Sequence, residues 1–403
     1  MQPLAVINAG SSSIKFALYE NDGEYPILFR GQVEKLGVAP RLIVANAEGE
    51  QLTEQNWRAG ELDHASATQT ILETAVGLLG GRKVGIVGHR VVHGGTQFAS
   101  PVVITPAIMA ELRKLCPLAP LHQPHNLAAI DAIAAAAPHI QQVACFDTAF
   151  HRAQPELAQM FALPRELSDL GIRRYGFHGL SYEFIAMRLK EVAPEVATGK
   201  VIVAHLGNGS SLCAMSDGQS VGTTMGFTAV DGLMMGTRCG SLDPGVLIYL
   251  MDERGMDARA LEDLIYRRSG LLGVSGVSSD MATLRGSSDP AASKAIELFV
   301  YRIVREVGSL AAALGGVDAI VFTGGIGQND RQTRAEIAEG CGWLGLILDP
   351  QRNETGPGRI DGEGSRMAAY VIRTDEEQMI ARHASALFGG APKAQNIDQT
   401  IRV

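Results

Sequence analysis

LAVINAGSSSIKFAL, at residues 4–18, and VIVAHLGNGSSLCAM, at residues 201–215, repeat one pattern. Each stretch has an apolar run, a turn rich in glycine and serine, and a second short run, which is typical of a β-hairpin. The turn Gly10-Ser11-Ser12 aligns with Gly209-Ser210-Ser211, about half the chain later. A repeat at this long offset predicts two related lobes rather than a short-period solenoid.

Three further apolar runs end in polar or glycine-rich segments. They lie at residues 84–87 before GHRVVHGG, at 142–146 before Asp147, and at 319–322 before TGGIGQND. Helical patterns lie between the runs, for example at residues 183–192 and 295–314. Strands that alternate with helices predict an α/β fold with ligands bound at the strand ends, and we expect a cleft between the two lobes.

Length and composition narrow the class of protein. A chain of 403 residues is long enough for two domains, and its 46% hydrophobic and 19% charged residues are those of an ordinary globular protein. Asp and Glu (43) outnumber Lys and Arg (35), which gives a net charge of -8. This charge opposes attraction to nucleic acid or anionic lipid, so we expect neither a nucleic-acid nor a membrane partner.

The cysteines and the apolar windows indicate a cellular compartment. The five cysteines are odd in number and widely spaced and contain no CxxC pair, which disfavours a disulfide framework or a zinc site. The N-terminus lacks a signal-peptide pattern, and the most apolar windows are too short to cross a bilayer. We therefore expect a soluble, cytoplasmic protein.

The glycine-rich turns are the first chemical signal. Glycine lets backbone N–H groups approach an anion closely, and serine hydroxyls add further donors. Neither turn fits GxxxxGK[ST], and no GxGxxG opens a helix after the first strand, so a P-loop is excluded and a dinucleotide fold is disfavoured. A single turn of this kind is more often a plain hairpin, but two matching turns together with TGGIG favour phosphate binding.

Seven segments of the chain resemble one family. They are INAGSSSIK at residues 7–15, GHRVVHGG at 88–95, FDTAFH at 146–151, YGFHG at 175–179, HLGNGSS at 205–211, GLMMGTR at 232–238 and GGIG at 324–327. They closely resemble acetate kinases and their propionate kinase relatives, from the first strand to about Arg382. The resemblance implies a two-lobed, actin-like α/β fold with a duplicated core. It also implies an N-terminal lobe of residues 1–148 with 379–403, on the substrate and phosphate side, and a nucleotide-binding lobe of residues 149–378.

The same resemblance implies a phosphotransferase with a carboxyl group as acceptor. Such an enzyme transfers the γ-phosphoryl group of ATP reversibly to acetate by direct in-line attack, which gives acetyl phosphate and ADP. Propionate or another short-chain carboxylate is the alternative acceptor. The resemblance further implies Mg²⁺, or Mn²⁺ in its place, and a homodimer.

Two arginines fit the electrostatics of this reaction. Attack of a carboxylate on a phosphoryl group brings several negative charges together, so the protein must supply cations and hold the reactants in line. Guanidinium groups bind carboxylate or phosphoryl oxygens in a bidentate way. The resemblance implies that Arg90 contacts the substrate carboxylate and that Arg238 contacts the transferred phosphoryl group. Ordinary surface salt bridges are the alternative for an arginine outside a motif.

Two histidines and one aspartate are further candidates for functional roles, and for His205 and Asp147 a structural role is the alternative. The resemblance implies that His178 stabilises phosphoryl oxygens, that His205 lines the nucleotide phosphates and that Asp147 is catalytic beside the arginines. Because a carboxylate substrate is already ionised, Asp147 is better suited to orienting an arginine or the water shell of magnesium than to removing a proton. A structural hydrogen bond is the alternative for His205, and a helix N-cap is the alternative for Asp147. His89, His93 and His122 we interpret as structural.

The resemblance assigns the remaining site residues in three groups. Asn8 and Glu376 are the metal-associated residues, with Glu377 as an adjacent competitor. The methyl group of the substrate is enclosed by Val92, Leu121, Phe177 and Ala229. The nucleotide is bound by Ser11, Ser13, Lys15, His205, Leu206, Gly207, Asn208, Gly209, Asp280, Met281, Ala282, Gly324, Gly325, Ile326, Gly327 and Gln328.

The sequence departs from the family pattern at several points. Ala282 stands where the family commonly has arginine, which predicts relaxed discrimination between ATP and GTP unless Arg285 compensates. Ala229 and Val230 stand where Pro and Leu are frequent, which predicts a roomier methyl pocket and some use of propionate. Further departures are Leu180-Ser181-Tyr182 for Thr-Ser-His, Gln328 for Glu, and Cys239-Gly240-Ser241 for Ser-Gly-Asp.

Two other functions use the same phosphate hairpins. An actin-like scaffold or chaperone that hydrolyses ATP slowly needs the hairpins, but it does not need arginines on the acceptor side. A sugar kinase needs a carboxylate base for its hydroxyl nucleophile, and Asp147 is the candidate in the sequence. The arginine motifs GHRVVHGG and MGTR favour a carboxylate kinase over both.

Overall fold

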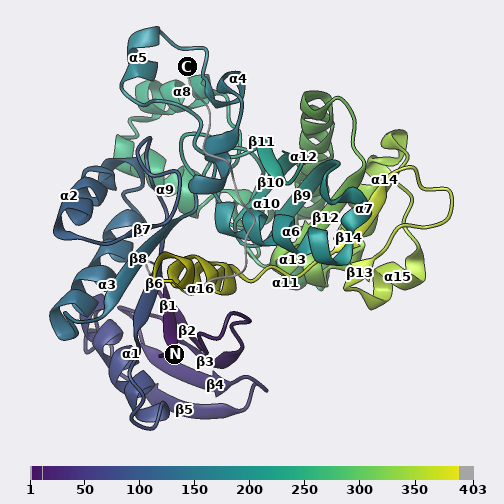
Figure 1. The fold of residues 1–403 in the computed structure, drawn as a ribbon. Helices are drawn as coiled ribbons and strands as arrows, with labels where there is room; N and C mark the ends of the chain where they lie inside the picture. The colour runs from purple at the N-terminus through teal and green to yellow at the C-terminus, as the bar shows by residue number, and fades with distance from the viewer. Residues whose placement is uncertain (1, 11, 390–403) are drawn as a thin grey trace, which may run out of the picture. The chain divides into compact units, whose positions relative to one another are not determined.

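The computed structural model describes residues 2–10 and 12–389, and contacts divide the chain into two compact units (Figure 1). Unit 1 consists of Met1–Ala149 and of the segment that begins at Glu376, and unit 2 is Phe150–Asp375. The chain therefore leaves unit 1 once and returns to it once. Each unit is built on its own sheet.

Unit 1 contains a mixed sheet in the order β5-β4-β3-β2-β1-β6-β8-β7. β1 pairs antiparallel with β2 and parallel with β6, and β6 pairs parallel with β8. The strands are β1 (Leu4–Ala9), β2 (Ile14–Tyr19), β3 (Ile27–Glu34), β4 (Arg41–Asn46), β5 (Gln51–Asn56), β6 (Ile86–Val91), β7 (Val102–Val103) and β8 (Gln141–Phe146). The helices are α1 (His64–Leu78), α2 (Pro106–Lys114), α3 (Gln123–Ala136) and α16 (Glu376–Leu387), with a short 3₁₀ turn at Cys116–Leu118.

Local sequence explains where the helices of unit 1 begin. Asp63 caps α1 by accepting a hydrogen bond from the backbone N–H of Ser66, whose side chain bonds back to the cap. Thr105 caps α2, and Pro106 occupies its first position. α16 lies directly on β6, because a Cβ added at Gly88 would come within 2.5 Å of Cγ2 of Ile380. Glycine at this position is what allows the close contact between helix and strand.

Unit 2 contains a second mixed sheet, in the order β11-β10-β9-β12-β14-β13. Its strands are β9 (Lys200–Leu206), β10 (Ser210–Ser216), β11 (Gln219–Thr223), β12 (Ala319–Thr323), β13 (Gly358–Arg359) and β14 (Ala368–Val371). Its helices are α4 (Glu156–Gln159), α5 (Arg165–Asp169), α6 (Gly179–Val192), α7 (Pro194–Ala197), α8 (Pro244–Arg254), α9 (Ala258–Arg267), α10 (Gly270–Ser275), α11 (Met281–Arg285), α12 (Pro290–Leu314), α13 (Gly324–Asn329), α14 (Arg331–Gly340) and α15 (Pro350–Thr355). Short 3₁₀ turns lie at Ala149–Ala153 and Gly342–Leu344.

The core of unit 2 forms around α12. This helix begins after the cap Asp289 and ends at Gly315, which has a positive φ of 66°. Phe299, Ile303 and Val307 are fully buried on one face of α12 and belong to the same apolar cluster as residues of β9, β10 and β12. Their spacing of four residues is that of one helical stripe, and burial of this stripe stabilises the sheet from one side.

The predicted hairpins and the duplicated core are confirmed. β1–β2 and β9–β10 are both antiparallel hairpins. Each first strand then pairs in parallel with a later strand, β6 in unit 1 and β12 in unit 2. The order β3-β2-β1-β6-β8 in unit 1 therefore corresponds to β11-β10-β9-β12-β14 in unit 2. Within the described residues, none of the helices has the length and apolar character needed to cross a bilayer.

Candidate active site

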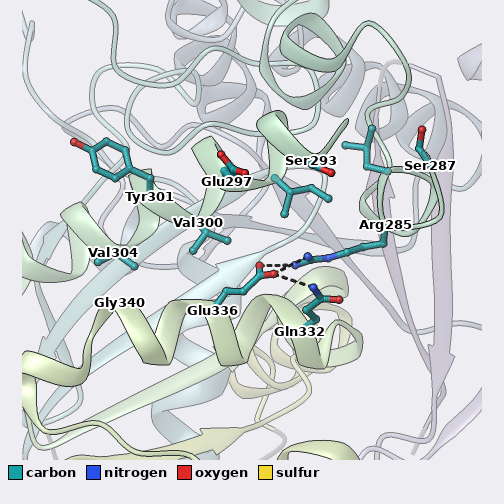
Figure 2. Close-up of a pocket in the computed structure, with 12 residues that line it drawn as sticks. Arg285, Ser287, Ser293, Glu297, Val300, Tyr301, Val304, Gln332, Glu336 and Gly340 are labelled. Atoms are coloured by element: carbon teal, nitrogen blue, oxygen red, sulfur yellow. Dashed lines mark hydrogen bonds and ion pairs between the residues drawn. The ribbon is translucent and has the colours of Figure 1, made fainter. Parts of the chain in front are cut away.

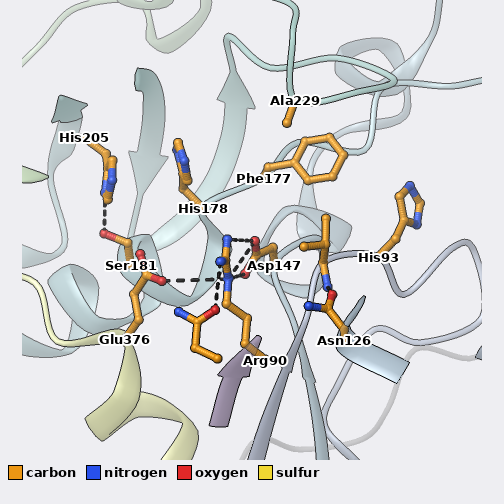
Figure 3. Close-up of polar contacts among 12 residues, drawn as sticks. Arg90, His93, Asn126, Asp147, Phe177, His178, Ser181, His205, Ala229 and Glu376 are labelled. Carbon is orange, nitrogen blue, oxygen red and sulfur yellow. Dashed lines mark hydrogen bonds and ion pairs between the residues drawn. The ribbon is translucent and has the colours of Figure 1, made fainter. Parts of the chain in front are cut away.

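Arg90 is the centre of a charged cluster in unit 1. It lies on β6, and Asp147 directly follows the neighbouring parallel strand β8. The guanidinium binds the carboxylate in a bidentate way, with 2.9 Å from Nε to Oδ1 and 2.5 Å from Nη2 to Oδ2 (Figure 3). Asp147 is almost fully buried. This pair is therefore not an ordinary surface salt bridge, and both oxygens of Asp147 accept hydrogen bonds from Arg90.

Two more oxygen-bearing side chains complete the cluster. Nη1 of Arg90 donates to Oδ1 of Asn8 on β1 at 3.2 Å, and Nε of Arg90 lies 3.9 Å from Oε2 of Glu376, the first residue of α16. Asn8, Arg90 and Asp147 thus come from three neighbouring parallel strands. The amide and two carboxyl groups surround one guanidinium.

The cluster changes the acid–base behaviour of its members. Burial is the main cause that raises the pKa of Glu376 to about 7, and repulsion from Asp147 and Glu377 adds to it. The attraction of Arg90 and Lys15 offsets these two causes only in part. Burial by itself would lower the pKa of Arg90, but the carboxylates of Asp147 and Glu376 outweigh that effect and raise it. Glu376 is therefore not the solvated start of a helix, and it changes charge near neutral pH.

The segment after Arg90 is held by two amide side chains of α3. The backbone N–H of Val92 donates to Oδ1 of Asn126 at 3.0 Å, and the backbone N–H of His93 donates to Oε1 of Gln123 at 3.1 Å. Asn126 also donates to the carbonyl of Ala9 at 2.6 Å, which ties this segment to the end of β1. Sequence patterns did not reveal either amide as part of the site, because polar residues at a helix start look like ordinary surface residues.

The remaining predicted residues of unit 1 lie at the first glycine-rich turn and before α3. The backbone N–H of Gly10 donates to the carbonyl of Ser13 at 2.8 Å, and Nε2 of His64 lies 2.8 Å from the carbonyl of Gly10. Lys15 is exposed and pairs in register with Asn8. Ser11 lies outside the described residues. Val92 is buried, and the half-buried Leu121 lies in the turn before α3.

In unit 2, two histidines form a stacked pair. The rings of His178 and His205 lie 4.3 Å apart at an angle of 22°. Nδ1 of His178 lies 2.9 Å from Oγ of Ser211. Nδ1 of His205 lies 2.8 Å from Oγ of Ser181 (Figure 3). His178 directly precedes α6 with a positive φ of 59°, a conformation that is unusual for a residue with a side chain. The predicted phosphate-side histidines are thus placed together by hydroxyl groups.

The two glycine-rich turns of unit 2 lie side by side. A Cβ added at Gly324 would come within 2.6 Å of the carbonyl oxygen of Leu206, and φ of Gly324 is +76°. The backbone between β12 and α13 therefore contacts the end of β9, as the parallel pairing of Thr323 with His205 requires. This contact brings GGIG next to the turn of Gly207, Asn208 and Gly209.

A buried arginine holds the helix that GGIG begins. Nη1 of Arg334 donates to the carbonyl oxygens of Gly327 at 3.0 Å and Gln328 at 2.8 Å. Its Nε and Nη2 bond to Asn353. Ile326 packs against the core of unit 2, and Gly325 lies at the start of α13. The sequence pattern gives no sign of the role of Arg334, since an arginine in a polar helix pattern looks solvated.

Arg238 contacts the backbone of a residue predicted for the methyl pocket. Its Nη1 donates to the carbonyl of Ala229 at 2.9 Å. A Cβ added at Gly209 would lie 3.6 Å from the same nitrogen and 3.2 Å from Nε2 of His178. The structure therefore brings Arg238, His178 and the Gly209 turn together. Phe177, which precedes His178, is buried in the same unit.

The segment predicted for the adenine side is a capped helix turn. Oδ2 of Asp280 accepts hydrogen bonds from the backbone N–H and from Oγ1 of Thr283, both at 2.8 Å. Met281 is buried and Ala282 is exposed. The carboxylate of Asp280 is therefore engaged in capping α11.

Arg285, the residue suggested as a substitute for an arginine at position 282, is held in a network of ion pairs and hydrogen bonds. Its guanidinium donates to both carboxylate oxygens of Glu336, at 2.8 and 2.6 Å, and to Oγ1 of Thr333 at 2.9 Å. Asp330 adds a contact at 3.3 Å. Figure 2 shows this arginine in the wall of a pocket of about 610 Å³ between α11, α12 and α14. The network ties α11 to α14.

Comparisons with known proteins agree with one family. Residues 4–382 match the acetokinase family. An acetate kinase from Rhodopseudomonas palustris strain TIE-1 is 54% identical over 96% of this chain and 98% of its own length, and one from Methylocella silvestris is 51% identical over 95% and 97%. Among solved structures, an acetate kinase from Porphyromonas gingivalis has a TM-score of 0.87 at 38% identity, covering 96% of this chain and 100% of its own. A propionate kinase from Francisella tularensis has a TM-score of 0.89 at 34% identity with the same coverage.

Proposed function

Because the chain belongs to the acetokinase family, we propose that it transfers the γ-phosphoryl group of ATP reversibly to acetate and forms acetyl phosphate and ADP. The observation that carries this proposal is the Arg90 cluster, in which a nearly buried carboxylate holds a guanidinium ready for an anionic acceptor. Such a group neutralises a carboxylate substrate and fixes its oxygens in line with a phosphoryl group.

Asp147 acts on Arg90 and not as a base. Both of its oxygens accept hydrogen bonds from Arg90, at 2.9 and 2.5 Å. An acetate nucleophile needs no base, because a free carboxylic acid is ionised at neutral pH. A sugar kinase would need this carboxylate for a hydroxyl proton, so the ion pair counts against that alternative.

The phosphoryl group is the proposed ligand of residues in unit 2. Arg238 and His178 neutralise and hydrogen-bond its oxygens, which carry the developing charge of the transition state. The turn of Gly207 to Gly209 and GGIG supply backbone N–H groups to the nucleotide phosphates. His205 lines the same phosphates from the end of β9.

Magnesium fits this arrangement as a companion of the nucleotide. The donors on the protein side are Oδ1 of Asn8 and the carboxylate of Glu376, both beside Arg90. Within the described residues, no group of three or more His, Cys, Asp or Glu side chains could hold a metal, so phosphate and water must supply most ligands. When bound, Mg²⁺ would neutralise charge on the phosphates, and Mn²⁺ has the same preference for oxygen.

We also propose a cytoplasmic homodimer. Among the described residues, none of the five cysteines forms a disulfide, which suits a reducing compartment that also supplies ATP. α8 buries none of its residues, and Val246, Ile248, Tyr249 and Met251 are each at least 40% exposed on it. Aliphatic side chains around a whole helix are unfavourable in water, and a second copy of the chain would cover them.

The direct test is a hydroxamate assay for acyl phosphate with acetate, propionate and butyrate side by side. We expect the highest kcat/KM with acetate. ATP hydrolysis without acyl phosphate for any of the three acids would favour an actin-like scaffold and contradict the proposal. A higher kcat/KM with propionate would keep the carboxylate kinase and replace its main substrate.

A further inference from the structure

Tyr182 lies beside the histidine pair of unit 2, with its ring edge-on to His205 and its hydroxyl in contact with Ser211. It belongs to the first turn of α6 and is fully buried. Its hydroxyl contacts Oγ of Ser211, and that oxygen lies 2.9 Å from Nδ1 of His178. Three residues from α6, β10 and the segment before α6 are therefore joined in one chain of polar atoms.

The ring of Tyr182 has little freedom to move. It stands edge-on to the buried ring of His151 at 5.6 Å, and it lies 6.5 Å from the ring of Phe150. The ring of His205 is a third neighbour, at 6.4 Å. Ser211 is fully buried as well, so the hydroxyl pair is closed off from solvent. The hydrogen bonds of such a pair have to be made within the protein.

The chemistry of the three groups favours one direction of donation. A phenol is a stronger acid than an aliphatic alcohol, so the O–H of Tyr182 is the better donor of the two hydroxyls. If Tyr182 donates to Ser211, the single proton of Ser211 can point to Nδ1 of His178. A neutral imidazole that accepts at Nδ1 carries its proton on Nε2.

The other end of His178 faces the proposed phosphoryl site. A Cβ added at Gly209 would lie 3.2 Å from Nε2 of His178 and 3.6 Å from Nη1 of Arg238. Nε2 and the guanidinium therefore border the same glycine. A proton on Nε2 would point a donor to the side where Arg238 supplies positive charge, which is where developing phosphoryl charge needs stabilisation.

We propose that Tyr182, acting through Ser211, is a positioning residue that keeps His178 in the Nε2-protonated tautomer during phosphoryl transfer. This proposal rests on the proposed kinase function for its consequence in turnover, but the tautomer itself can be measured without turnover.

The test uses Tyr182→Phe and Ser211→Ala, with Tyr370→Phe as a matched control. Tyr370 is in the same unit, and its hydroxyl donates to Glu195 at 2.8 Å, outside the histidine pair. Protein labelled with ¹⁵N-histidine has ten histidines, few enough for long-range ¹H–¹⁵N spectra to identify the tautomer of each. The signals of His178 are assigned by their loss in His178→Gln.

Wild type and Tyr370→Phe are expected to show the Nε2-protonated form of His178. Ser211→Ala should populate the Nδ1-protonated form, with at least a tenfold lower kcat and KM values for acetate and ATP within twofold. Tyr182→Phe should lower kcat about three- to tenfold, because Ser211 then loses its fixed orientation.

Two results would overturn the proposal. One is the Nδ1-protonated form in wild type, and the other is an unchanged tautomer and kcat in both variants. If Ser211→Ala fails to fold, Tyr182→Phe decides alone, since it keeps the buried ring. A wild type without acyl phosphate synthesis would instead contradict the kinase assignment, which the spectra distinguish from a wrong tautomer.

Discussion

Three adjacent strands place the guanidinium of Arg90 next to its oxygen partners Asn8 and Asp147. Because Asn8, Arg90 and Asp147 lie on or directly after adjacent parallel strands, the sheet itself sets their spacing. A lysine could not replace Arg90, since two nitrogens of the guanidinium, Nε and Nη2, bind Asp147 at the same time. Arg238 is held differently, through the carbonyl of Ala229.

Arg90→Ala and Arg238→Ala are each expected to lower kcat/KM for acetate at least 100-fold. The reason is lost charge compensation in an anionic transition state. Initial rates of acyl hydroxamate formation measure the effect, with Arg113→Ala as control, because Arg113 forms an exposed ion pair with Asp131. A variant within threefold of wild type, equal to less than about 1 kcal/mol, would show that its assigned role is wrong.

The side chain at position 282 is expected to affect the discrimination between ATP and GTP. Arg285 is engaged with Glu336, Asp330 and Thr333. We expect Ala282→Arg to raise the ratio of kcat/KM for ATP over GTP, because a guanidinium can stack on adenine. Ala282→Leu adds bulk without charge and serves as control. An equal ratio in wild type and Ala282→Arg counts against the idea.

The loop between β11 and α8 should influence which acid is used. A proline at position 229 keeps the carbonyl that accepts from Arg238 at 2.9 Å, while it fills and stiffens the segment. We expect Ala229→Pro to lower the ratio of kcat/KM for propionate over acetate by at least about fivefold, since one methylene is worth about 1 to 3 kcal/mol.

Steady-state kinetics with both acids measure that ratio, and Ala229→Gly provides the opposite change in volume. Two findings would contradict the argument about the pocket: no propionate turnover in wild type, or a ratio that Ala229→Pro leaves unchanged. Neither finding would affect the assignment as a carboxylate kinase.

Helix α8 gives a prediction about assembly. Ile248 is 60% exposed and Tyr249 is 52% exposed. We expect Ile248→Asp to shift the protein from dimer to monomer in light scattering coupled to size exclusion, because a carboxylate cannot be buried against an apolar partner. Leu157→Asp, at an 85% exposed position on α4, is the control. A wild type that is monomeric at all concentrations would contradict the proposal.

The elements that the sequence predicted are those with a local pattern. The two hairpins, the strand before Asp147 and the strand before GGIG are found at β1–β2, β9–β10, β8 and β12. Alternating or continuous apolar runs suffice to predict these, because burial of the strand is encoded within a few residues. The glycine-rich segment TGGIG was expected after a strand, and its glycines begin α13.

The contacts that the sequence did not reveal join distant positions. Asn126 accepts a hydrogen bond from the backbone of Val92. Arg334 donates to the carbonyl of Gly327, and Arg285 forms an ion pair with Glu336. Each joins polar residues that, in a single sequence, look like solvated helix faces. Their partners are fixed by the packing of one helix on another, which short-range patterns do not specify.

Taken as one folded chain, the protein should be sensitive to pH through Glu376. Burial raises the pKa of this carboxyl to about 7, above its ordinary 4.5. Between these values the unfolded chain releases a proton that the folded chain keeps. The contribution of this carboxyl group to the free energy of unfolding is therefore fully present below about pH 4.5 and is lost as the pH rises through about 7.

Glu376→Gln removes this dependence. We expect the free energy of unfolding of the variant, relative to that of wild type, to increase by up to about 3 kcal/mol between pH 5 and pH 8, at 1.36 kcal/mol per unit of pKa. Urea denaturation at the two pH values measures the difference. Glu73→Gln, on the exposed side of α1, is the control and should show no such gain. Parallel pH profiles of wild type and Glu376→Gln would contradict the prediction.

The path of the chain through its two units sets an order for biosynthesis. α16 covers β6 so closely that Ile380 would meet a Cβ at Gly88, yet its residues follow the entire sequence of unit 2. At roughly 5 to 20 residues per second, the ribosome needs roughly 10 to 50 s to make unit 2. During that time the nascent first sheet lacks its last helix, so the side of β6 that α16 covers stays uncovered until nearly the whole chain has been made.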